Sequence, residues 1–251
     1  MNALNVSLVV FVCAFGGALL GIFLQRLLPA QHVNPESKDV VRICMGLVAS
    51  TVALVLGLLV YSAKGFYDTQ TTEVTQLAAN VVLLDRVLAH YGPESAGART
   101  ELQHSMQRQL ELLWAPPGPE GINAYSRGHS GEVLLDKIQE LSPKDDRQRT
   151  LQGQAVNLAF QMGQTRLLML TQRSVSVPKV LVIMLVFWLT ALFVSFGLFA
   201  PTNYTVVLSL FFAAAAVCGA VFLMIEMYYP YRGFIQVSPA PLISALAQLG
   251  Q

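Results

Sequence analysis

Charged residues are scarce in this chain of 251 residues, because Asp, Glu, Lys and Arg together make up only 12% of it. A soluble globular domain carries about 25% of such residues, so the composition argues against an ordinary soluble protein. The net charge of +1 gives no basic surface that would suit nucleic acid as a partner. A hydrophobic content of 54% is typical of a membrane protein.

Charge is entirely absent from three long stretches, 1–25, 43–63 and 180–225. A helix needs roughly 20 apolar residues to cross a bilayer, so the first two stretches predict one span each. The third is long enough for two spans joined by a turn. The first stretch lacks the charged start and short apolar core of a cleaved signal peptide, so we expect it to be retained. The four predicted spans are 4–27, 41–62, 178–199 and 204–228.

Metal-binding and catalytic motifs are also lacking. The three cysteines all fall inside predicted spans and suggest no disulfide framework: Cys13, Cys44 and Cys218. The four histidines have no carboxylate or cysteine at metal-ligand spacing: His32, His90, His104 and His129. No phosphate loop, GxSxG or HExxH sequence occurs. We therefore expect no enzymatic activity, no cofactor and no metal.

A polar region at 63–177 separates the second and third spans. The even number of spans places both termini on the same side of the membrane as this region. Five basic residues lie near span ends on that side and three on the other: Lys64, Arg166, Arg173, Lys179 and Arg232 against Arg26, Lys38 and Arg42. Basic residues favour the cytoplasmic side. The sequence thus predicts an all-α integral membrane protein with transmembrane helices in 1–62 and 178–229, a helical cytoplasmic domain at 63–177 and a short cytoplasmic tail at 230–251.

A heptad pattern connects the second span to the polar region. Apolar residues alternate at spacings of three and four, as on the contact face of a coiled coil: Val74, Leu77, Val81, Leu84, Leu88 and Tyr91. The same register continues backwards through Gly65 into the second span. We therefore expect one continuous helical rod over 42–91, ended by Gly92, with Pro93 opening the next helix.

A second rod is predicted to return towards the membrane. Ser142 is the expected N-cap of this helix, followed by Pro143 and Asp145 in its first turn. Its apolar pattern extends to about 175, which would place it antiparallel to the first rod. Shorter helices are expected at 93–114 and 131–141, with loops at 115–121 and 126–131.

Small residues recur on one face of several spans. Gly17 and Gly21 form a GxxxG motif, which lets membrane helices approach closely. Just outside the second span, Lys64 and Asp68 lie one helical turn apart and are either a solvated surface pair or a ring of charges at a pore mouth in an oligomer. Glu73, Gln76 and Asn80 form a polar stripe that is either a solvated face or a binding groove.

The stretch SAKGFYDTQTTEVTQLAANVVLLDRVLAHYGPE (62–94) resembles the bestrophin-like family, earlier known as a domain of unknown function. The tail PYRGFIQVSPAPL (230–242) is similar to the C-terminal signature of that family. The four-span plan also matches across essentially the whole chain. The matching positions of the first stretch are Lys64, Asp68, Gln70, Glu73, Val74, Leu77, Ala78, Ala79, Asn80, Leu83, Leu84, Asp85, Arg86, Leu88, Tyr91, Gly92, Pro93 and Glu94.

The resemblance implies a homo-oligomeric channel, distantly related to bestrophin anion channels, whose second transmembrane helix surrounds the pore. Small residues occupy that helix here in place of the aromatic neck of true bestrophins, and the expected pore-lining set is Ala49, Ser50, Ala53 and Gly57. The implied partners are further copies of the chain, the lipid bilayer and inorganic anions. The two amphipathic rods leave a second hypothesis open, a non-conducting membrane scaffold or sensor that binds proteins through its cytoplasmic helices.

Overall fold

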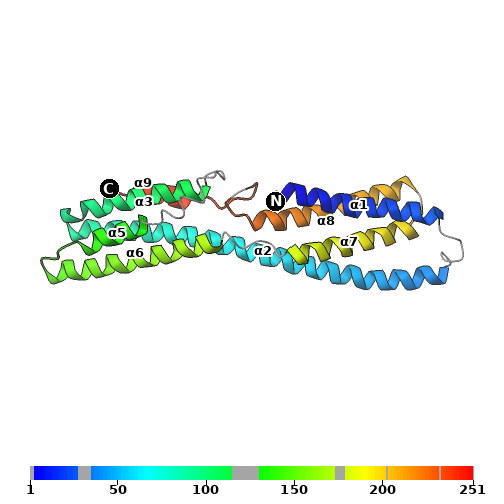
Figure 1. Ribbon diagram of the computed structural model, residues 1–251, viewed down its shortest axis with the longest axis horizontal. Coiled ribbons are helices and arrows are strands. Elements are labelled where there is room, and N and C mark those ends of the chain that lie inside the picture. Colours follow the sequence, from blue (N-terminus) through cyan, green and yellow to red (C-terminus); the bar gives the residue numbers. More distant parts are fainter. Residues whose placement is uncertain are drawn as a thin grey trace. The chain divides into compact units, whose positions relative to one another are not determined.

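The computed structural model describes residues 3–27, 35–114, 130–172, 179–201, 203–231 and 233–250. Within these ranges the chain forms helices and turns and no strand, as the all-α prediction requires. The chain divides into two compact units, whose helices are labelled in Figure 1. Unit 1 comprises Met1–Tyr67, Ser176–Tyr229 and Gly233–Ile235, and unit 2 comprises Asp68–Val175, Pro230–Arg232 and Gln236–Gln251.

Unit 1 is built from apolar helices that coincide with the four predicted spans. They are α1 (Ala3–Leu27), the first part of α2 (Pro35–Tyr91), α7 (Lys179–Phe199) and α8 (Tyr204–Met227). Each contains a segment long and apolar enough to cross a membrane. Their shared core includes Val10 of α1, Leu185 of α7 and Met224 of α8.

Helix α1 packs closely against α7 and also contacts α8, and the three lie together in Figure 1. Glycines allow the approach to α7. A Cβ atom on Gly21 would overlap the carbonyl oxygen of Val194, and one on Gly197 would overlap that of Ala18. The GxxxG motif therefore marks a real helix crossing, as predicted.

Helix α2 is continuous from Pro35 to Tyr91, with no interruption at Gly65. The predicted rod is thus confirmed, although it begins seven residues earlier than the expected position 42. Pro35 explains this start, since proline has a favourable backbone angle for the first helical position and needs no hydrogen-bond acceptor there.

Unit 2 is a helical bundle. It contains the second part of α2, the short turn η2 (Pro93–Ser95), α3 (Ala96–Trp114), α5 (Ser130–Gln139), α6 (Asp146–Gln172) and α9 (Ala240–Gln248). All six heptad residues of α2 from Val74 to Tyr91 are buried, as the sequence pattern predicts. The other helices bury their own apolar faces, for example Leu102 of α3 and Ile138 of α5.

Hydrogen bonds at both ends of α6 confirm that it runs antiparallel to α2. Near its start, the Gln148 amide donates to the Tyr91 carbonyl oxygen at 3.0 Å. At its end, the Gln172 amide donates to Glu73 at 3.1 Å. The positions thus run in opposite directions along the two helices. The expected continuation of α6 to about 175 lies outside the described residues, as do the predicted loop at 115–121 and residues 126–129 of the second predicted loop. The last two residues of that second loop, Ser130 and Gly131, belong to α5 instead.

The predicted N-cap of α6 is wrong. The helix begins at Asp146 rather than directly after Ser142, and Asp145 caps it by accepting a hydrogen bond from the backbone N–H of Gln148 at 2.6 Å. The Gln148 side chain reaches back to the backbone N–H of Lys144 at 2.7 Å. This reciprocal pair resembles a capping box shifted by one residue, a combination that the Ser-Pro signal conceals in the sequence.

The C-terminal segment of the chain is folded onto unit 2. Helix α9 packs on α3, with Leu242 and Ala245 buried. The Trp114 indole N–H donates to the Val237 carbonyl oxygen at 3.0 Å, and the Trp114 ring meets the Tyr231 ring edge-on. The predicted short tail is therefore an ordered part of the bundle.

Candidate functional site

The apolar part of α2 is the least covered of the four membrane-type segments. Only 6% of its most apolar window is buried within the chain, against 33% for α1 and α7 and 17% for α8. One side of α2 does face the unit 1 core, through Val52, Leu59 and Ala63. The rest of its circumference is therefore available to lipid, to another copy or to a lumen.

Small residues form a lane along the uncovered side. Gly46, Ser50, Ala53 and Gly57 are all exposed, and their spacing of four, three and four residues places them on one face of the helix. A Cβ atom on Gly46 or Gly57 would meet nothing within 4 Å. Of the predicted pore-lining residues, Ser50, Ala53 and Gly57 thus lie on the open side, while Ala49 is half-buried beside the core.

A second lane of large apolar residues adjoins the first. Leu47, Leu54, Leu58 and Tyr61 are 72%, 64%, 59% and 78% exposed. Such an apolar surface is stable only against lipid or another apolar partner. The uncovered side of α2 therefore has two parallel rows of residues. The row of small residues suits close helix packing or a lumen, and the adjoining row, the large-residue lane, suits contact with lipid or another apolar surface.

The hydroxyl groups on the open side of α2 bond to its own backbone. Ser50 donates to the Gly46 carbonyl oxygen and Thr51 to that of Leu47, both at 3.0 Å. Further along the helix, Lys64 and Asp68 are both exposed, as expected for charges beyond the span.

The signature residues Gln70 and Glu73 belong to a polar cluster in unit 2. Tyr231 donates its hydroxyl to Gln70 at 2.8 Å. The Gln70 amide in turn donates to Glu73 at 3.2 Å and to Gln172. Gln70 is only 1% exposed. The cluster therefore ties α2 to the end of α6 and to the C-terminal segment.

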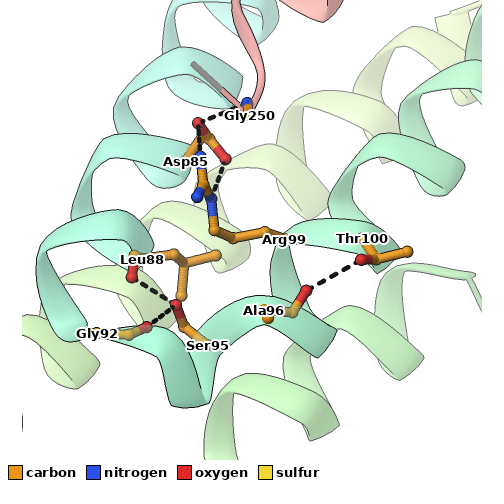
Figure 2. Close-up of polar contacts among 8 residues, drawn as sticks. All are labelled: Asp85, Leu88, Gly92, Ser95, Ala96, Arg99, Thr100 and Gly250. Carbon is orange, nitrogen blue, oxygen red and sulfur yellow. Dashed lines mark hydrogen bonds and ion pairs between the residues drawn. The ribbon is translucent and has the colours of Figure 1, made fainter.

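Asp85 forms the second polar tie of unit 2 (Figure 2). Its carboxylate accepts two hydrogen bonds from the Arg99 guanidinium, at 2.7 and 2.8 Å, and a longer one from the Gly250 backbone N–H at 3.4 Å. Asp85 is 5% exposed. The hydrogen bond from Arg99 to Asp85 raises the pKa of Arg99 above its ordinary value. The neighbouring signature residue Arg86 is exposed.

The sequence Tyr91-Gly92-Pro93 forms the turn from α2 into α3. Gly92 has φ = 126°, a value that favours glycine. The buried Ser95 hydroxyl lies within hydrogen-bond distance of the Leu88 carbonyl oxygen and of the Gly92 carbonyl oxygen, at 2.8 Å for the latter (Figure 2). The end of α2 is thus capped by this turn, as the glycine and proline predict.

An ion pair joins this turn to the start of α6. Lys144 donates to the Glu94 carboxylate, and both side chains remain accessible to solvent. The hydrogen bond from Lys144 lowers the pKa of Glu94 below its ordinary value of 4.5. The same bond raises the pKa of Lys144.

The predicted polar stripe of α2 is only partly a solvated face. Gln76 is exposed, but Glu73 is half-buried and Asn80 is 7% exposed. The Asn80 amide nitrogen has no hydrogen-bond partner in the described part of the chain. Asn80 adjoins the heptad residue Val81 and is buried with it.

Several residues that form hydrogen bonds between distant parts of the chain were not predicted from the sequence to do so. Gln172, Arg99 and Trp114 carry no motif of their own, and only their partners lie in the signature. Glu226, at the end of α8, is 6% exposed and accepts the backbone N–H of Phe234 at 2.6 Å. That bond holds the turn at Gly233, whose φ is 95°; the similarity of the tail to the family signature was the available signal.

Among the described residues, no group of three or more His, Cys, Asp or Glu side chains is placed so that it could hold a metal ion. His32 and His129 lie outside the described residues. Cys13, Cys44 and Cys218 are free thiols.

Comparison with known proteins places the chain in a family. The model of the Bestrophin-like domain matches residues 12–242. Two solved structures, both variants of a bacterial Bestrophin homolog from Klebsiella pneumoniae, share the fold with a TM-score of 0.70 and 12% identity. The alignments cover 94% and 96% of this chain and 97% of each homolog. No curated protein matches the sequence. Because the family match spans nearly the whole chain, the protein belongs to the Bestrophin-like domain family.

Proposed function

We propose that this protein is a homo-oligomeric ion channel of the cytoplasmic membrane, with the open side of α2 lining its pore. The observation that carries the proposal is the lane of Gly46, Ser50, Ala53 and Gly57, which is exposed in the single chain although it lies in a membrane-type segment. Several copies of such a lane around a common axis would enclose a narrow lumen, with the large-residue lane packed on neighbours or lipid. Membership of the Bestrophin-like family supports this reading.

Anion conduction is the form of the proposal that follows from the relation to bestrophins. Lys64 at the end of the span would attract anions, with Asp68 one turn further on. One observation favours a cation instead. The Ser50 and Thr51 hydroxyls donate to carbonyl oxygens of their own helix, which leaves oxygen lone pairs as the polar groups that a lumen would present. Oxygen lone pairs coordinate cations.

Current recordings test both whether the protein conducts and whether the permeating ion is an anion or a cation. Purified protein in a planar bilayer under a KCl gradient should give single-channel steps, and the reversal potential should lie near that of chloride for an anion channel and near that of potassium for a cation channel. A bilayer that stays silent at several voltages and pH values would contradict the channel proposal.

Cysteine substitution tests the lane itself. In a background with the native cysteines replaced, Ala53→Cys should make the current sensitive to a charged, water-soluble thiosulfonate reagent, because a lumen is hydrated. Leu58→Cys, on the large-residue lane, is the matched control and should be insensitive. Sensitivity at position 58 alone would place the lumen on the other lane.

The scaffold hypothesis retains one supporting observation. Phe160, Leu167 and Leu168 of α6 are large apolar residues that are 64%, 62% and 44% exposed, and an exposed apolar surface of this kind suits a protein partner. A solved oligomer whose axis is filled by packed side chains along its whole length would favour the scaffold over the channel.

A further inference from the structure

A groove with a volume of about 1010 Å³ lies in unit 2 between α3, α5 and α6. Its walls are mainly apolar and include Leu112, Leu135, Phe160 and Leu167. Small-molecule sites in proteins commonly have volumes of about 300–1,000 Å³ and walls of this kind. The hydrogen bonds of Asp85 and Gln70 involve none of these side chains, so the groove is separate from the two polar ties.

A buried glutamine distinguishes this groove from a bare apolar surface. Gln109 of α3 lines it and is 2% exposed. Neither its amide nitrogen nor its amide oxygen has a hydrogen-bond partner among the described residues. Buried polar groups almost always have partners, and burial without one is unfavourable. A rotation of this side chain towards the groove would let a bound molecule supply both hydrogen bonds.

The chemistry of Gln109 defines the group that it would recognise. An amide presents one donor and one acceptor side by side, and another planar amide matches both at once. A carboxylate offers no donor to the Gln109 oxygen. The charged residues of the wall, Glu132 and Arg166, have opposite signs, so the groove has no net charge to attract an ion.

We propose that unit 2 binds an uncharged, mainly apolar small molecule whose carboxamide or lactam edge pairs with the Gln109 amide. The apolar walls cover the body of this molecule, and the amide pair fixes its orientation. This site goes beyond ion conduction and does not depend on it.

Photolabelling of the full-length protein in lipid nanodiscs tests the proposal. The probe is 4-benzoylbenzamide, whose benzophenone is apolar and photoreactive and whose carboxamide has both a donor and an acceptor. Its N,N-dimethyl analogue lacks the donors. We expect the carboxamide to label groove peptides of α3, α5 or α6 about five- to tenfold more than the analogue, the ratio that one net hydrogen bond gives.

Two pairs of variants locate the effect. Gln109→Leu should reduce carboxamide labelling to the level of the analogue, while Gln107→Leu, an exposed glutamine on the same helix, should not. Gly163→Leu should block both probes by filling the groove and should leave the fold intact, since a Cβ atom there meets nothing within 4 Å. Gly153→Leu is its control on α6, with equally open surroundings.

Three outcomes would overturn the proposal. Equal labelling by the two probes would show that the groove binds apolar molecules without recognising their amide group. Labelling that persists in Gln109→Leu would remove Gln109 from the site. Absence of groove labelling in the assembled wild-type protein would show that another copy, or another part of the same chain, already covers the groove.

Discussion

At the scale of single residues, buried polar side chains of the family stretch hold helices of unit 2 together. Asp85 is buried and bonded to Arg99 of α3 and to the backbone of Gly250. Gln70 joins α2 to Gln172 and Tyr231. Both side chains are buried, so their hydrogen bonds stabilise the packing of the helices of unit 2.

Replacing Asp85 should therefore destabilise the protein. Asp85→Asn removes the charge that faces the Arg99 guanidinium and places an amide donor against it. We expect the free energy of unfolding to fall by about 1–3 kcal/mol, the usual penalty for a hydrogen-bonded group left without its partner. Thermal unfolding of the purified protein measures this loss. Arg86→Gln is the control and should be near neutral, because Arg86 is exposed; equal losses would contradict the structural role of Asp85.

The Glu94–Lys144 pair gives a prediction about acid stability. The pKa of Glu94 is lowered from 4.5 by the hydrogen bond from Lys144, so the unfolded chain takes up this proton at a higher pH than the folded one. Its stabilising contribution is present above pH 4.5 and is lost as the pH falls through the lowered pKa. The difference in melting temperature between the wild type and Glu94→Gln should be small, since the pair is exposed, and should vanish in acid. Lys144→Gln should abolish the same difference, and an undiminished difference at low pH would contradict the pairing.

At the scale of elements, the crossing of α1 and α7 depends on glycine. Gly21→Ala places a methyl group onto the Val194 carbonyl oxygen, so the two backbones must separate. We expect a loss of about 1–3 kcal/mol or more in stability, as for other overpacked sites. The thermal unfolding of the variant in detergent or nanodiscs measures it. Gly16→Ala is the matched control, because its methyl group would meet nothing within 4 Å, and a similar loss there would mean that the crossing is not the cause.

Helical periodicity explains why most elements could be predicted from the sequence. The heptad pattern of α2 from Val74 to Tyr91 correctly predicts which residues are buried, because a helix places residues three and four apart on one face. The charge-free runs likewise reported the spans. The cap of α6 was missed because Ser142 and Pro143 give a strong local signal, whereas the cap at Asp145 depends on how Gln148 turns back in three dimensions.

The polar sites were less predictable, because their partners are distant in the chain. Gln70 bonds to Gln172, 102 positions away, and Asp85 bonds to Gly250, 165 positions away. Local pattern contains no information about such pairs. Asn80 was predicted to lie on a stripe that is either a solvated face or a binding groove, yet tertiary packing covers it. The open lane of α2 could be proposed from its small residues, but its exposure in the single chain required the structure.

At the scale of the whole molecule, the arrangement in the membrane rests on two features of the sequence. If all four membrane-type helices cross the bilayer, both termini lie on one side, and the bias of basic residues predicts that this side is the cytoplasm. Two of the basic residues behind the bias, Arg173 and Arg232, lie outside the described residues.

Cysteine labelling on intact cells tests the orientation. Gln107 of α3 and Asn203 between α7 and α8 are both exposed, and the span order assigns them to opposite sides of the membrane. In a background with Cys13, Cys44 and Cys218 replaced, a membrane-impermeant maleimide should label Asn203→Cys and should not label Gln107→Cys until the cells are opened. The opposite pattern would reverse the orientation and place unit 2 outside the cell. Labelling of both positions on intact cells would be incompatible with the single span, α7, that separates them in the chain, and would require a different number of membrane crossings.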